Sequence, residues 1–267
     1  MDIHTTIQDL AEQLGVPENT LRHIAWKAPQ SYYKKIIPKK DGSERIIYPP
    51  CFSLKAIQKK LLKEVLCKLP VDNCIGGNAY SSPKQLMKEH VDQKVVIRID
   101  MSNFFPNIKR QKLYKILRSR GFSLDATQVI LQLTTYQGGL PQGAPTSTQL
   151  ARLAINAPIR HIKNLFKFPV KITVWVDDIV ISGPTSIVNH IDTIYCILIR
   201  HGFFINKDKT AIMYSKDEQS ALGIRVDHQC LEPDSSFMKK YRAAVAEGIS
   251  AKSIQGMRNY IRHIKKK

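Results

Sequence analysis

The sequence predicts an α+β fold in which a small antiparallel sheet packs on helices. Runs of apolar residues at helical spacing alternate along the chain with short runs rich in valine and isoleucine. Acidic residues stand at the ends of two of these β-type runs, where strands are expected to give way to turns. At 267 residues the chain is long enough to bury a core, in one large domain or in several lobes.

The first part of the chain is expected to combine helices with one hairpin. Apolar side chains share one helical face over 5–28, with a break at Gly15 to Pro17. Two short β-type runs flank Asp41-Gly42, a pair typical of hairpin turns. In order, the expected elements are helices over 5–28, a lysine-rich hairpin over 32–50, an amphipathic helix over 53–69 and a glycine-rich loop over 74–85.

The rest of the chain is expected to hold the sheet and further helices. Gly202 is placed to cap the C-terminal end of one helix. In order, the expected elements are a strand over 94–108, a helix from Lys109, a helix over 125–136, a loop over 138–149, a buried helix over 150–166, strands over 170–176 and 179–182, a helix over 186–202, strands over 203–206, 211–214 and 221–226, and helices up to the C-terminus.

Two neighbouring aspartates interrupt the apolar stretch ITVWVDDIVISG (172–183). Burying one unpaired carboxylate costs several kcal/mol, and Asp177 and Asp178 also repel each other. Asp100 stands in a similar setting, after the β-branched run VVIRI. Hard cations with oxygen ligands, above all Mg²⁺, would neutralise three carboxylates at one sheet edge. Two such ions about 4 Å apart stabilise both the attacking and the leaving oxygen in phosphoryl transfer.

The chain is strongly basic. It holds 41 lysines and arginines against 22 aspartates and glutamates, a formal net charge of +19. An excess of this kind favours a polyanionic partner, because each neutralised phosphate releases counterions. Charge alone also allows a basic protein that binds no nucleic acid.

The sequence gives no sign of a secreted or membrane protein. The N-terminus lacks the pattern of a signal peptide, and no long apolar run suggests a membrane span. Five widely spaced cysteines, without a C-x-x-C pair, indicate reduced thiols rather than disulfides or a zinc site. A cytoplasmic protein without a membrane partner is therefore expected.

Several segments together resemble the reverse transcriptases. They are IPKKDGSERII, VIRIDMSNFFPNI, GLPQGAPTSTQLARLAINAPI, VWVDDIVISG, GFFINKDKT and ALGIRVD, and they follow the order and spacing of that family's blocks over roughly 30–226. The wording LPQGAPTS, the pattern IPK-x-x-G-x-x-R and the KAIQ helix are most similar to the bacterial retron type. Trp175 stands where the acidic box of the family usually has tyrosine.

The resemblance implies a right-hand polymerase with fingers, palm and a short helical thumb. The expected divisions are an N-terminal helical extension over 1–30, the first part of the fingers over 31–94, a palm with an interleaved fingers segment over 95–226 and the thumb over 227–267.

The resemblance also implies an activity. A retron-type enzyme would be an RNA-directed DNA polymerase that copies a structured non-coding RNA into single-stranded DNA (msDNA), using dNTPs and two Mg²⁺ ions. Its RNA–DNA product, together with an effector protein encoded nearby, often serves in antiphage defence. Two alternatives stay open: another bacterial lineage, of abortive-infection or intron-derived type, and a non-catalytic RNA-binding scaffold.

The family's functional residues fall on defined positions of this chain. Asp100, Asp177 and Asp178 match the catalytic, metal-binding aspartates. Phe105 matches the steric gate that excludes a ribose 2′-OH. The remaining matches are to nucleotide-binding positions: Lys39 or Lys40 and Arg45 for the triphosphate, Gln142 and Gly143 for the incoming nucleotide, and Lys209 for a lysine near the leaving pyrophosphate.

Overall fold

The structure is a computed structural model of the whole chain, and it describes residues 5–38, 42, 44–78, 81–227 and 230–266. Helices and antiparallel strands are mixed in it, which confirms the predicted α+β class. The chain forms two compact units. Unit 1 comprises 1–72, 103–157 and 202–204, and unit 2 comprises 73–102, 158–201 and 205–267.

Unit 1 begins with two short helices, as the sequence predicts. Helix α1 (Ile7–Leu14) starts at a capping box, because the Thr6 hydroxyl accepts from the Asp9 amide and the Asp9 carboxylate accepts from the Thr6 amide. It ends at Gly15, whose φ of 59° is a left-handed conformation that glycine adopts without strain. Helix α2 (Glu18–Lys27) follows after Pro17.

A two-stranded hairpin and a helix come next. Strands β1 (Lys35–Pro38) and β2 (Glu44–Ile47) pair antiparallel, with Ile37 opposite Arg45. Helix α3 (Phe52–Glu64) is held on the rest of the unit by Gln58, whose buried amide donates to the Tyr32 hydroxyl at 2.7 Å and to the Leu133 carbonyl at 2.6 Å. The remaining helices of the unit are α5 (Phe104–Asn107), α6 (Arg110–Ser119) and α7 (Leu124–Thr134).

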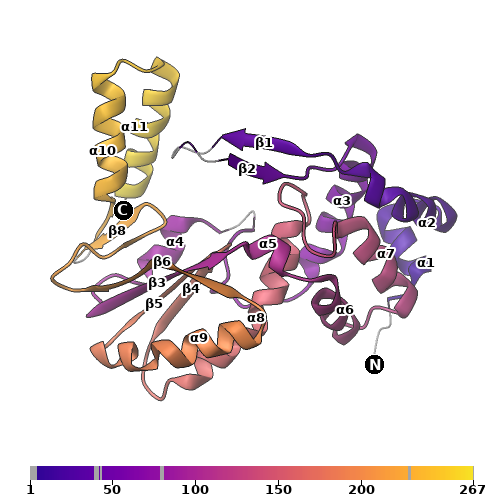
Figure 1. The fold of residues 1–267 in the computed structure, drawn as a ribbon, viewed down its shortest axis with the longest axis horizontal. Helices are drawn as coiled ribbons and strands as arrows, with labels where there is room; N and C mark the ends of the chain where they lie inside the picture. The colour runs from indigo at the N-terminus through magenta and orange to yellow at the C-terminus, as the bar shows by residue number, and fades with distance from the viewer. Residues whose placement is uncertain (1–4, 39–41, 43, 79–80, 228–229, 267) are drawn as a thin grey trace. The chain divides into compact units, whose positions relative to one another are not determined.

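Unit 2 is built on a four-stranded sheet of order β4-β5-β3-β6. Its central pair, β3 (Val95–Ser102) and β5 (Asp178–Gly183), is antiparallel, and so is the pair of β5 with β4 (Lys171–Trp175). Strand β6 (Phe204–Tyr214) lies beside β3. Figure 1 shows helix α9 (Ile191–Arg200) beside these strands. The buried residues of this helix include Ile194 and Leu198. Helix α8 (Ser147–Leu165) runs from unit 1 into unit 2.

The free side of β4 is covered by a short extended segment. Ile75 forms a parallel bridge with Val174, the Gly76 amide donates to the Val174 carbonyl at 2.8 Å, and the Val174 amide donates to the Cys74 carbonyl at 2.9 Å. This segment therefore satisfies backbone groups that an edge strand otherwise exposes.

A second sheet and two long helices complete unit 2. The sheet has the order β7-β8-β9, from β7 (Ser220–Ala221), β8 (Ile224–Asp227) and β9 (Cys230–Pro233). Helices α10 (Ser235–Ala246) and α11 (Ala251–Lys265) pack together through the rings of Phe237 and Tyr260, 4.7 Å apart. An apolar cluster joins this part to helix α4 (Pro83–Lys88) and to the larger sheet through Met87, Val180 and Ile264.

Several predicted boundaries are wrong, each for a local reason. The predicted strand 94–108 ends at Ser102, because Asn103 turns left-handed (φ 46°) and Phe104–Asn107 forms a helical turn. The predicted strands 203–206 and 211–214 are one continuous strand. The predicted strand 221–226 is a hairpin turning at Leu222-Gly223, both with positive φ.

Other differences concern helices. Helix α4 lies in a region for which the sequence predicts only the end of a glycine-rich loop, and its start is a capping box at Ser82 and Gln85. The helix predicted over 53–69 leaves α geometry at Val65 and continues as a 3₁₀ turn. Strand β9 was not predicted. The fingers, palm and thumb boundaries stay predictions.

Two general expectations can be compared with the structure. All five cysteines are described, and no disulfide joins any of them. Within the described ranges, no helix is long and apolar enough to cross a membrane.

Candidate active site

The three predicted catalytic aspartates lie together in unit 2. Asp100 on β3 and Asp178 on β5 are directly opposite each other in the antiparallel register. Asp177 belongs to the tight turn between β4 and β5, and its carbonyl accepts from the Met101 amide at 3.0 Å. All three aspartates are half-buried, and the charges of Asp100 and Asp177 both act on the carboxyl group of Asp178.

The turn that carries Asp177 is strained. Trp175 and Asp178 are the paired residues that close it, which leaves Val176 and Asp177 as its two central residues. Val176 has a φ of 57°, a left-handed conformation that a β-branched residue rarely adopts and that costs of order 1–3 kcal/mol. Such strain persists only where the surrounding structure enforces it, here by the ladders on both sides of β5.

The electrostatics of the cluster are unfavourable without a cation. Burial, together with the neighbouring charges of Asp177 and Asp100, raises the pKa of Asp178 to about 6. Arg98 and Lys209 oppose this effect. A carboxyl group shifted by burial and by two like charges is the pattern that functional sites show.

Two basic residues border the carboxylates. Lys209, which the sequence predicts near the leaving group, is exposed on β6, and its carbonyl accepts from the Arg98 guanidinium at 3.2 Å. Sequence reasoning missed Arg98. Its signal was a charged residue inside the otherwise apolar run VVIRI, at the half-buried position two residues before Asp100.

The donor set of the cluster fits a hard divalent cation. Within the described part of the chain, no three His, Cys, Asp or Glu side chains gather closely enough to form a complete metal site. Mg²⁺ does not require one, because it usually binds through one or two carboxylates and completes its shell with water and substrate phosphates. The pKa of Asp178 is raised by burial and then by the like charges of Asp177 and Asp100, and a bound cation would favour its ionised form.

A second group of predicted residues lies together in unit 1. The Gln142 carbonyl accepts from the Tyr48 amide at 2.8 Å, which attaches the loop to the base of the hairpin. Gly143 has a φ of 104°, and a Cβ there would lie 3.5 Å from Ile47. The loop thus approaches the hairpin closely through a conformation that only glycine adopts readily.

The predicted triphosphate residues belong to this hairpin. Arg45 is exposed on β2, opposite Ile37. Lys39 and Lys40 lie outside the described residues.

Phe105, the predicted steric gate, lies on the helical turn α5 and is half-buried. Its neighbour Phe104 is buried and contacts it edge-on, with ring centroids 5.4 Å apart.

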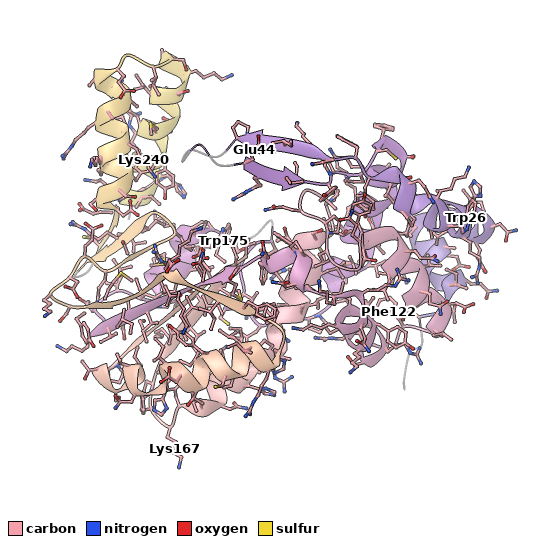
Figure 2. The ribbon with its side chains drawn as sticks, viewed as in Figure 1. Trp26, Glu44, Phe122, Lys167, Trp175 and Lys240 are labelled. Atoms are coloured by element: carbon pink, nitrogen blue, oxygen red, sulfur yellow. The ribbon has the colours of Figure 1, made fainter. Side chains whose placement is uncertain are left out.

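Trp175, which precedes the turn bearing Asp177, packs against a glycine of a neighbouring segment. Trp175, labelled in Figure 2, ends β4, and its ring lies against Gly76. A Cβ at position 76 would lie 2.8 Å from the ring atom Cε3 and 2.6 Å from Leu86 Cδ1. Glycine is therefore required at this position for an indole to fit.

Comparison with known proteins identifies the family. The family model described as reverse transcriptase (RNA-dependent DNA polymerase) matches residues 37–226. Retron Ec86 reverse transcriptase of Escherichia coli is 25% identical over 272 residues, covering 99% of this chain and 85% of that protein. Retron Se72 reverse transcriptase of Salmonella heidelberg (strain 579083-10) is 28% identical over 231 residues, covering 82% of this chain but 60% of that protein.

Solved structures agree on the fold. Telomerase from Candida albicans, in complex with a fragment of telomeric RNA, superposes with a TM-score of 0.55 at 16% identity, over 76% of this chain and 45% of that one. A foamy viral protease-reverse transcriptase in complex with an RNA/DNA hybrid gives a TM-score of 0.53 at 20% identity, over 87% of this chain and 27% of that one. The chain therefore belongs to the reverse transcriptase (RNA-dependent DNA polymerase) family, and it is a retron-type member of that family.

Proposed function

We propose that this protein copies a structured non-coding RNA partner into single-stranded DNA, the msDNA of a retron, by Mg²⁺-dependent nucleotidyl transfer from dNTPs. Asp100, Asp177 and Asp178 would carry the chemistry. The RNA–DNA product would act in antiphage defence with an effector protein encoded nearby, and the protein would work in the cytoplasm.

The observation that carries the proposal is the pairing of Asp100 with Asp178 beside the strained turn of Asp177. A fold gains nothing in stability from a half-buried carboxyl group, Asp178, whose pKa is raised by burial and by the like charges of Asp177 and Asp100. Their presence is accounted for by a function that needs concentrated negative charge. Nucleotidyl transfer needs it to hold divalent ions against a triphosphate.

In the proposed reaction the 3′-oxygen of the growing DNA attacks the α-phosphorus of a dNTP, and pyrophosphate leaves. Two Mg²⁺ ions held by Asp100 and Asp177, with Asp178 beside them, would stabilise the attacking and leaving oxygens. Lys209 and Arg98 keep Asp178 closer to its ionised state by lowering its pKa. Lys209 is also the predicted donor near the pyrophosphate, and its exposure allows its ammonium group to move.

The proposed nucleotide contacts come from the hairpin and its neighbouring loop. Arg45 would bind the triphosphate, because the planar guanidinium pairs with phosphate oxygens in two hydrogen bonds. Lys39 or Lys40 would add charge there. Gln142 and Gly143 would line the nucleotide, and Phe105 would exclude the ribose 2′-OH.

The test is dNTP incorporation on a primed RNA, with and without Mg²⁺. Asp177→Asn removes one charge from the cluster with little change in shape, and it should lower incorporation by about two or more orders of magnitude. Asp192→Asn is the matched control, because Asp192 is exposed on α9. A folded Asp177→Asn protein with wild-type activity would overturn the site assignment.

A second experiment addresses the substrate. Nucleic acid that copurifies with the protein is sequenced after expression with its native genomic neighbourhood. A branched RNA–DNA molecule of defined sequence is expected. Unbranched DNA would favour another bacterial reverse transcriptase lineage, and an RNA alone that survives the Asp100→Ala change with full biological effect would favour the RNA-binding scaffold.

A further inference from the structure

The turn that carries Phe105 rests on two supports within unit 1. It is only four residues long, Phe104–Asn107, and its first residue follows the left-handed Asn103. A turn this short has little internal stability. The position of the Phe105 ring therefore depends on what packs against the turn.

The first support is an aromatic stack. The ring of Phe104 lies on that of Phe203, with centroids 5.8 Å apart and planes at 26°, and it contacts Phe105 edge-on at 5.4 Å. Phe203 is 1% exposed and Phe104 5%. Buried rings in contact shift together or not at all, because interiors are packed too densely for one ring to move alone.

A lysine closes the far end of this stack. The Lys112 ammonium, on α6, lies 3.7 Å from the centroid of the Phe203 ring, a cation–π contact. Burial lowers the pKa of Lys112 to about 8, so the ammonium is still mainly charged at pH 7. A half-buried lysine on an aromatic face holds the ring more firmly than an exposed one.

The second support is a close backbone contact. A Cβ on Gly139 would lie 2.5 Å from the Pro106 carbonyl oxygen, so the loop touches the turn directly. Gly139 also bridges Lys109 at the end of the turn, and the Arg110 amide donates to the Gly138 carbonyl at 3.0 Å. The turn is thus fixed by backbone at Pro106 and by rings at Phe104.

We propose that Phe203 and Lys112 are positioning residues that set the place of the Phe105 ring, and through it the discrimination between deoxyribonucleotides and ribonucleotides. The inference rests on the proposed role of Phe105 as a steric gate. Steric exclusion depends on a ring edge standing within a few tenths of an ångström of the sugar, because repulsion rises steeply with approach. A substitution at Phe203 or Lys112 therefore weakens the exclusion of ribonucleotides by Phe105, although neither residue contacts the nucleotide.

The experiment measures kcat/KM for single dCTP and rCTP additions on a primed RNA, using the full chain. Phe203→Leu keeps an apolar side chain but removes the stacked ring, and it should lower the dCTP/rCTP ratio by about tenfold. Lys112→Met keeps the length of the side chain but removes the charge, and it should lower the ratio by about threefold. Lys115→Met is the matched control, an exposed lysine one turn along α6, and it should leave the ratio unchanged.

The ratio separates positioning from mere instability, because partial unfolding lowers both rates equally. Gly139→Ala is a second, independent test. The added methyl group should displace Pro106 and thereby also lower the dCTP/rCTP ratio. Phe105→Ala gives the largest loss of discrimination if the gate is correctly assigned.

One outcome overturns the inference and leaves the proposed function intact: Phe105→Ala lowers the dCTP/rCTP ratio, but Phe203→Leu and Lys112→Met keep the wild-type ratio. An unchanged ratio in Phe105→Ala overturns the gate assignment and the inference with it. No dNTP addition by the wild-type protein overturns the proposed function itself.

Discussion

At the scale of single residues, Asp178 shows a conflict between stability and function. Its pKa is raised to about 6, so near neutral pH the folded chain holds a carboxylate that burial and two neighbours disfavour. Such a group lowers the free energy of unfolding as pH rises through the interval between its unfolded and folded pKa values, because there the folded state holds a proton that the unfolded state has already released.

Asp178→Asn should therefore stabilise the metal-free protein while abolishing polymerisation. The expected gain is about 3 kcal/mol at pH 8, because each unit of pKa shift corresponds to about 1.4 kcal/mol. The gain should shrink to about half at pH 5, where the folded wild type is already protonated. Urea unfolding in EDTA measures it, and a destabilised Asp178→Asn protein at pH 8 would contradict the electrostatic account.

His90 shows the opposite pH dependence. Its ring is fully buried between the Ser182 hydroxyl on β5 and the Thr173 hydroxyl on β4, each 2.7 Å away, and burial lowers its pKa to about 4. The unfolded chain binds a proton here from about pH 6.5 downward, and the folded chain does not until about pH 4. The stability that His90 contributes is therefore present above pH 6.5 and is lost as pH falls.

Compared with His90→Gln, the wild type should lose about 2 kcal/mol of unfolding free energy between pH 7 and pH 5. Taking the difference between the two proteins cancels the contribution of Asp178, which is common to both. Urea denaturation at each pH gives the values. Parallel pH profiles would mean that His90 is not buried as a neutral ring.

At the scale of elements, the hairpin β4–β5 carries both the aspartates and Trp175, whose ring packs against the neighbouring segment 74–76. The segment 74–76 pairs with β4 and brings Gly76 under the ring of Trp175, next to the turn that bears Asp177. A larger ring before the acids is thus accommodated by the smallest residue on the neighbouring segment.

Gly76→Ala should destabilise the protein by about 1–3 kcal/mol, because the new methyl group meets Trp175 and Leu86 at less than contact distance. Trp175→Phe should recover about 1 kcal/mol of this loss, since the smaller ring leaves room for the methyl group. The four proteins of this double-mutant cycle are compared by urea denaturation. Strictly additive effects would show that residues 76 and 175 do not share this contact.

The elements that the sequence predicts correctly are those whose own residues carry the pattern that identifies them. The helices α1 and α2, the hairpin β1–β2 and the acidic hairpin β4–β5 each carry their own periodicity and turn residues. Helix α4 was missed because its six residues hold too few apolar positions to show a period. The turn Phe104–Asn107 was read as strand because its two phenylalanines also suit a strand, and tertiary packing decides the outcome.

The same distinction applies to the candidate site. Asp100, Asp177 and Asp178 were predicted because an acid inside an apolar run is visible in the sequence, and the structure brings them together. Arg98, Lys112 and Phe203 were missed because their roles depend on contacts between distant segments. A lysine over an aromatic ring about 90 positions later leaves no local pattern.

At the scale of the whole molecule, the positive charge is concentrated at the C-terminal end. Residues 235–266 hold eight lysines and arginines against Glu247 as the sole acid. Most of these residues lie on α10 and α11, which pack together through Phe237 and Tyr260 rather than through ion pairs. Lys265 pairs with Glu232 at 3.4 Å, whereas Lys240 and Lys252 are exposed and accessible to a polyanion.

RNA binding should weaken steeply with salt, by about 10³-fold or more between 50 and 200 mM if six or more phosphates are contacted. Replacing Lys240 and Lys252 by glutamine should reduce the slope of log K against log salt by up to about 2. Fluorescence anisotropy with a labelled RNA measures both slopes. Equal slopes for the two proteins would exclude these lysines from the phosphate contacts.

The segment 74–76 that lies along β4 has a consequence for self-association. Without it, the backbone groups of β4 around Val174 would be exposed at the edge of the four-stranded sheet, where a strand of another chain could pair with them. Because residues 74–76 pair with β4, they block the addition of a strand from another chain at this edge. A variant that detaches them, such as one with proline in place of Gly76, should form aggregates rich in β-structure before it loses its helices.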